Sequence, residues 1–145
     1  MKIPLAFFIF ILIPTSSFSA DFTRDIRCLS ANAKNGGKIN LMYVDVSYDK
    51  DNWSSNYVKY EKSSKPITLI PVSIKVVDDG TKSNKIAIKW KEFVDGAYIG
   101  EYSMVSQGVY IETFTYQDKK GNLFSFQDNP ELLSADGKTC NWKNK

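Results

Sequence analysis

Apolar and polar residues alternate with a period of two through most of this chain, and this pattern restricts the possible fold more than any other feature. In segment 85–93, large apolar side chains alternate with small or basic ones, so one face would carry Ile86, Ile88 and Trp90. Residues two apart share a face of a β-strand, which predicts a strand with one buried and one solvated face. No window of a dozen residues keeps a helical apolar period. The predicted fold class is therefore all-β.

Segment 39–48 alternates in the same way and is predicted to have two unlike faces. We expect a buried face with Met42, Val44, Val46 and Tyr48, and a wetter face with Asn40, Tyr43, Asp45 and Ser47. Segment 66–77 contains Pro66 and Pro71, which predicts an edge strand or a strand broken near Pro71. Four further strand candidates are segments 56–61, 97–105, 109–117 and 122–127.

Turn residues separate these segments at hairpin spacing. Asp95-Gly96 suits a two-residue hairpin turn, and segments 33–37, 78–84 and 118–122 are polar turns or loops. Gln107-Gly108 is expected to form either a tight turn or a bulge, because glycine permits positive φ, and we favour the turn. One helical turn is expected after Pro130. Seven or eight strands with such connections predict a single antiparallel barrel or sandwich.

The first twenty residues have the layout of a secretory signal peptide. Lys2 precedes an apolar run, Leu5 to Ile13, which is followed by small residues. We expect residues 1–19 to be removed, with cleavage after Ala20 as the alternative, leaving a single β domain over 20–145. No cysteine lies near this boundary, so no lipid anchor is expected. The predicted location is the periplasm, or alternatively the exterior of the cell.

Two cysteines, Cys28 and Cys140, are the only ones in the chain. In an exported protein an even count predicts a disulfide. This bond would tie the first strand to the last and remove about 4–5 kcal/mol of denatured-state entropy. The alternative is two free thiols or a thiolate nucleophile.

The sequence contains no histidine, which removes the Ser-His-Asp and Cys-His catalytic systems and the commonest zinc ligand. No metal or cofactor is expected. The net charge of +3, or +2 without Lys2, is too small to suggest nucleic acid. Glu92 and Glu112 lie on aromatic-rich strands and could serve a glycan-acting enzyme. The alternative places Glu92 beyond the buried part of its strand and pairs Glu112 with a lysine.

Trp53 lies in a polar segment and is a candidate contact residue for a partner. Alternatively, its ring covers one end of the barrel. The preceding Asn52 begins an Asn-Trp-Ser triplet that fits a glycosylation site, relevant only to a eukaryotic secretory route.

The run Ser106-Gln107-Gly108-Val109-Tyr110 resembles a loosened S-G-x-x-Y motif, with Gln107 between the serine and the glycine. That motif belongs to the small periplasmic inhibitors of C-type lysozyme, which are exported antiparallel β-barrels with a disulfide. The resemblance implies that Ser106 and Tyr110 lie on a surface that blocks the cleft of an enzyme. Exported immunity proteins that neutralise wall-degrading toxins share the same general traits.

These features favour a periplasmic or secreted binding protein that inhibits a protein partner, either a cell-wall hydrolase or a toxin. The expected partner-binding residues are Ser106, Gln107, Tyr110 and Trp53. One alternative is a small-molecule carrier whose cavity is lined by the aromatic residues of 98–126. The others are the glycan-acting enzyme and a pilus or adhesin subunit.

Overall fold

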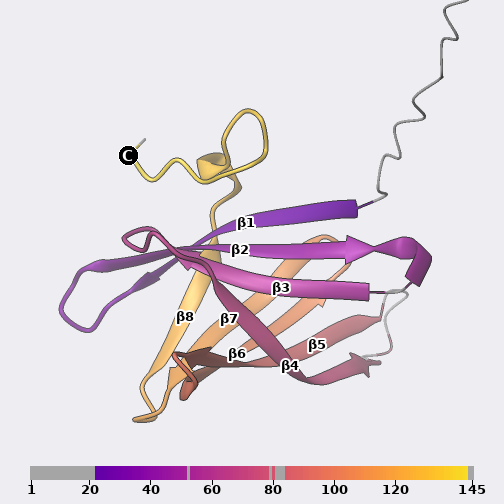
Figure 1. Ribbon diagram of the computed structural model, residues 1–145, viewed down its shortest axis with the longest axis horizontal. Coiled ribbons are helices and arrows are strands. Elements are labelled where there is room, and N and C mark those ends of the chain that lie inside the picture. The colour runs from indigo at the N-terminus through magenta and orange to yellow at the C-terminus, as the bar shows by residue number, and fades with distance from the viewer. Residues whose placement is uncertain (1–21, 52, 79, 81–83, 144–145) are drawn as a thin grey trace, which may run out of the picture.

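A computed structural model describes residues 22–51, 53–78, 80 and 84–143. Within these residues the chain forms a closed antiparallel barrel in which eight strands follow one another in chain order (Figure 1). The barrel confirms the all-β prediction and decides between barrel and sandwich. The strands are β1 (Phe22–Asn32), β2 (Lys38–Tyr48), β3 (Trp53–Tyr60), β4 (Ile67–Val77), β5 (Lys85–Val94), β6 (Ala97–Gln107), β7 (Tyr110–Asp118) and β8 (Leu123–Asp128). Two short 3-10 helices, η1 (Asp49–Asp51) and η2 (Pro130–Leu132), complete the fold.

The interior of the barrel is filled by aromatic side chains from neighbouring strands. Trp90 on β5 is paired with Tyr102 on β6, and Tyr102 is paired with Tyr116 on β7, so the three side chains share the inner face. Trp90 and Tyr102 are fully buried, and Phe114 packs between Tyr43 and Tyr102. The alternation predicted for β5 is confirmed. These rings pack on one another, whereas the carrier hypothesis expected them to line a cavity.

Two of the predicted hairpins form with two-residue turns. Asp95 and Gly96 both have positive φ, 50° and 78°, the backbone that a two-residue type I′ turn requires. At the other end of the barrel, Gln107 pairs with Tyr110 across a turn made by Gly108 and Val109. The prediction of a turn here is confirmed, one residue later than the sequence pattern placed it.

The C-terminal segment after β8 covers the outer face of β1 and β2. Met42 and Val44 on β2 pack there with Leu132 and Cys140, while Leu41 and Tyr43 on the same strand face the barrel interior. The expectation that Tyr43 and Asp45 lie on a solvated face is therefore wrong. The barrel encloses that face of β2, and the C-terminal segment buries the opposite face.

The predicted disulfide joins Cys28 to Cys140. Cys140 lies beyond β8, in the C-terminal segment, where it forms an isolated β-bridge with Leu133. The disulfide therefore ties β1 to the C-terminal segment, whereas we expected it to join the first and last strands. Such a bond is compatible with an extracellular or periplasmic location. No helix among the described residues is long and apolar enough to span a membrane.

The ladders between strands are uneven in length. β3 and β4 are paired only from Asn56/Leu69 to Val58/Ile67, and β1 and β8 only at Leu29/Asp128 and Ser30/Gln127. Figure 1 shows β4 running diagonally away from β3 beyond their short ladder. The edge character predicted from Pro66 and Pro71 is confirmed for this part of β4, which also has an irregularity between Pro71 and Ser73.

Candidate functional site

One end of the barrel gathers most of the residues singled out in the sequence. The register places the start of β1, the end of β2 and the start of β3 at this end, together with the β6–β7 turn. We call it the mouth. The other end carries the β5–β6 and β7–β8 turns.

The expected partner-binding residues Ser106, Gln107 and Tyr110 come together at the β6–β7 turn. Ser106 and Gln107 are partly buried, whereas Tyr110 is 76% exposed and the neighbouring Val109 is 71% exposed. The turn therefore presents an aliphatic and an aromatic side chain to solvent on a two-strand support.

Trp53 lies on a different part of the rim of the mouth, at the start of β3. It is 50% exposed, and its ring meets Phe22 edge-on with 6.5 Å between centroids. Phe22 also packs on Tyr48 at 5.0 Å. These rings form an exposed aromatic cluster on the rim. Asn52, the first residue of the glycosylation triplet, lies outside the described residues, as does the predicted signal peptide.

A cavity of about 230 Å³ opens within the mouth. Its walls differ in chemistry according to the strands that supply them. The wall from β5, β6 and β7 is mainly apolar and includes Ile86, Ile88, Met104 and Ile111, whereas the wall from β1 and β2 carries Asp25, Arg27, Tyr43 and Asp45.

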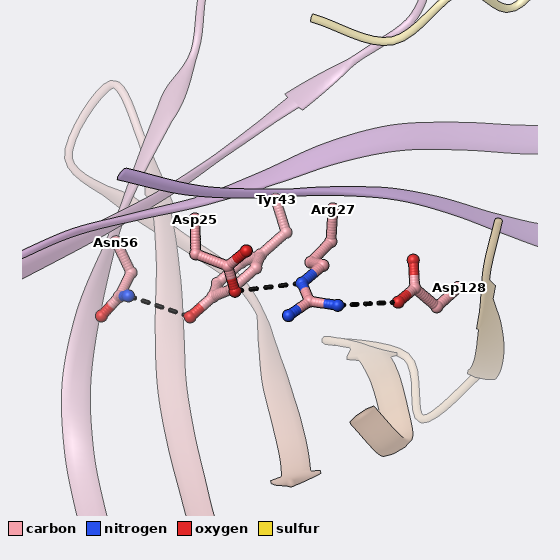
Figure 2. A network of polar contacts seen from close by, with 5 residues as sticks. All are labelled: Asp25, Arg27, Tyr43, Asn56 and Asp128. Carbon is pink, nitrogen blue, oxygen red and sulfur yellow. Dashed lines mark hydrogen bonds and ion pairs between the residues drawn. The ribbon is translucent and has the colours of Figure 1, made fainter. Parts of the chain in front are cut away.

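A network of polar contacts holds the charged wall in place (Figure 2). Arg27 lies between two carboxylates: its Nε donates to Asp25 at 3.0 Å and its Nη1 donates to Asp128 at 3.3 Å. Deeper in the barrel, Asn56 Nδ2 donates to the Tyr43 hydroxyl at 2.9 Å. Burial raises the pKa of Tyr43 still further above neutral, so its protonated hydroxyl is a stable acceptor for this bond.

Asp45 faces Asp25 directly across the β1–β2 ladder. Like charges in this position are destabilising. Burial raises the pKa of Asp45 and the charge of Asp25 raises it further, while a side-chain hydrogen bond with Asn56 partly offsets this rise. Within the described part of the chain, the buried Oδ1 atoms of Asp45 and Asp128 have no hydrogen-bond partner. The charged wall is therefore rich in carboxylates that a cation could satisfy.

The sequence interpretation missed this wall for a clear reason. Asp25 and Arg27 interrupt the apolar alternation of the strand expected around Cys28, which hides the bounds and the inner face of that strand, and the pattern of β2 predicts a solvated face for Asp45. The signal that could have found the wall is the shared strand parity of Asp25 and Arg27 with the apolar Leu29 and Ala31.

The two glutamates considered for catalysis lie apart. Glu92 is 2% exposed and faces inward, opposite Gly100 on β6, so the idea that it lies beyond the buried part of its strand is wrong. Burial raises its pKa, which a hydrogen bond with Tyr116 partly offsets. Glu112 is on the outer face in an ion pair with Lys85 at 2.9 Å, the lysine partner expected for it. The fold does not bring the two carboxyl groups into one site.

No group of three or more acidic, histidine or cysteine side chains is arranged to hold a metal ion in the part of the chain that the structure describes. The mouth therefore combines an exposed turn, an aromatic rim and a cavity with one apolar and one acidic wall. Comparisons of the chain with known protein families, with curated proteins and with solved structures found no match.

Proposed function

We propose that this chain is an exported binding protein that inhibits a protein partner, either a cell-wall hydrolase or a toxin. The observation that carries the proposal is the β6–β7 turn, where Val109 and Tyr110 are 71% and 76% exposed. The ladder below the turn extends from Gly100/Asp118 to Gln107/Tyr110, so the turn stands on a long two-strand support.

Such a turn suits insertion into the cleft of another protein. A segment already held in its bound conformation loses little entropy when it binds, so more of the contact energy appears as affinity. Tyrosine and tryptophan are the residues that anchor protein interfaces most often. Tyr110 on the turn and Trp53 on the rim would supply such anchors at the same end of the barrel.

The test is capture of a partner by the immobilised mature chain from periplasmic extracts and from culture fluids of competing bacteria. The decisive variant is Val109→Ser/Tyr110→Ser. Its matched control is Leu123→Ser/Tyr98→Ser, which also replaces one exposed aliphatic and one exposed tyrosine, 61% and 41% exposed, but near the opposite end of the barrel.

We expect the wild-type chain and the control to retain a hydrolase or toxin whose activity falls in proportion to the added chain, and the turn variant to retain neither. Equal retention by the turn variant would refute the role of the turn. Retention of no hydrolase or toxin, or turnover of a substrate by the purified chain itself, would refute the proposed function.

A further inference from the structure

Strand β4 has an exposed apolar edge next to the mouth. Among the described residues, its pairing with β3 ends at Leu69, so the segment from Ile70 to Val77 is paired only with β5. The aliphatic side chains of this segment are unusually exposed: Ile70 is 49%, Val72 47%, Ile74 66% and Val76 66% exposed. Ile74 and Val76 share one side of the strand and form an exposed apolar patch of the kind that marks interaction sites, and an unpaired strand edge is a template for another strand.

The inner face of this edge opens directly toward the mouth. Ile74 is paired with Ile88, and Val76 with Ile86, on the same side of β5 as the buried Trp90. Side chains on that side would normally be enclosed by the barrel. Here Ile74 and Val76 are two-thirds exposed, since β3 does not continue alongside them.

The charged wall of the mouth restricts the chemistry of a ligand that binds beside Ile74 and Val76. Among the described residues that line the cavity, Asp25 and Asp45 are accompanied by one guanidinium, that of Arg27, which already binds Asp25 and also Asp128 on β8. The two carboxylates and one guanidinium that line the cavity give a formal local charge of −1, within a chain whose net charge is +3. Asp45 Oδ1 has no hydrogen-bond partner in the described residues. The complementary ligand group is therefore a cation.

We propose that the slot between β3 and β4 accepts an extended segment of a protein partner, added as a strand along β4, with lysine or arginine side chains pointing into the mouth. Backbone groups of the segment would pair with those of Ile70 to Val77, as in other cases of strand addition. The aliphatic stem of an inward lysine or arginine would lie on Ile74 and Ile86, and its charged head would reach Asp45 and Asp25. Side chains alternate along a strand, so the residues between the cations would lie on the outer face beside Val77.

This inference deepens the proposed function and rests on it in one respect, namely that the segment belongs to the inhibited partner. Its test uses synthetic peptides and the whole mature chain, so it does not require that partner. The probe is a fluorescent heptapeptide of alternating lysine and valine, blocked at both ends. One comparison peptide has glutamate in place of lysine, and another carries N-methyl groups on alternate amides. Binding is followed by fluorescence anisotropy.

We expect the lysine peptide to bind at least about tenfold more tightly than either comparison peptide, because each lacks one of the two required interactions. In the protein, Asp25→Asn/Asp45→Asn should weaken binding by at least about tenfold. The control Glu101→Gln/Glu131→Gln removes the same charge outside the mouth and should leave binding unchanged. Circular dichroism shows whether each variant is folded, and the peptide comparisons stand even if one variant is not.

Equal binding of the lysine and glutamate peptides, or of the N-methylated peptide, would overturn the proposal. So would sedimentation showing a dimer that Ile74→Thr/Val76→Thr converts to a monomer, because β4 would then be covered by a second copy of the chain. If no peptide binds but the intact partner is captured through Val109 and Tyr110, this inference fails while the proposed function stands. If the lysine peptide binds and no hydrolase or toxin is ever captured, the slot is supported and the proposed function fails.

Discussion

Removing the disulfide tests how much of the stability comes from one covalent link. The variant is Cys28→Ala/Cys140→Ala, in which both half-cystines, 1% and 8% exposed, become alanine. The bond joins residues 112 positions apart. Closing a loop of this length removes about 16 cal/mol/K of entropy from the denatured chain, which corresponds to about 4.8 kcal/mol at 25 °C. Domains of this size are stable by about 5–15 kcal/mol, so the variant should lose between a third and nearly all of its stability.

Urea unfolding followed by tryptophan fluorescence measures this loss. Trp90 is fully buried in the core and reports global unfolding, whereas Trp53 is half exposed and contributes a weaker change. The denatured variant is less compact than the cross-linked wild type, so its m-value should rise. The comparison between variant and wild type must therefore use the free energies of unfolding extrapolated to water. The urea midpoints alone would mislead, because they also depend on the m-value. A loss smaller than about 1 kcal/mol would refute the entropic reasoning.

A truncated control separates the covalent link from the packing of the segment it holds. A chain ending at Asn129 with Cys28→Ala lacks both the bond and the contacts of Leu132 with the β1–β2 face that includes Val44. We expect this chain to be less stable than the double alanine variant. Equal stability would show that the C-terminal segment does not stay on this face without the bond.

Three substitutions in the core give further expectations, each measured by thermal or urea unfolding. Burial raises the folded-state pKa of Glu92, so the contribution of this side chain to stability is fully present at low pH and is lost as pH rises. Glu92→Gln should therefore be more stable than the wild type at neutral pH. The difference in stability should vanish below the ordinary glutamate pKa of 4.5. A Cβ at Gly100 would lie 2.5 Å from the Tyr116 hydroxyl, so Gly100→Ala should cost about 1–3 kcal/mol. Asn56 Oδ1 accepts the indole N–H of Trp90 at 3.1 Å, so Asn56→Ala should cost about 2–4 kcal/mol.

Each expectation has a contrary result that would count against it. A Glu92→Gln protein that is less stable at neutral pH would mean that the ionised carboxylate is well accommodated. An unchanged unfolding midpoint for Gly100→Ala would mean that β7 yields easily, and a loss below about 0.5 kcal/mol for Asn56→Ala would mean that water replaces the amide.

Strand patterns that depend on one buried face were predictable from the sequence. β5 is the clearest case, since its lysines face outward and Trp90 fills the core. The hairpin at Asp95-Gly96 was predictable too, because few residue pairs adopt positive φ at both positions.

Features that depend on distant segments were not predictable. β2 is covered on its outer face by residues around Leu132, ninety positions further along the chain than Met42, and no local pattern records that contact. The charged wall also escaped prediction, because Asp25 and Asp45 become neighbours only through the β1–β2 register. The position of Val109 and Tyr110 at a connection between two strands was easier to predict, because Gly108 beside them already indicated a turn.

The uneven ladders divide the barrel into two leaves. Strands β1–β3 form one leaf and β4–β8 form the other. The two leaves are joined by three residue pairs between β3 and β4 and by two pairs between β1 and β8. Opening either seam alone separates fewer residue pairs, three or two, than the four pairs of β7–β8, which is the shortest ladder within a leaf. The molecule would therefore open where the acidic leaf meets the aliphatic one, and a full opening would separate the ring of Tyr43 from those of Trp90 and Phe114 in the core.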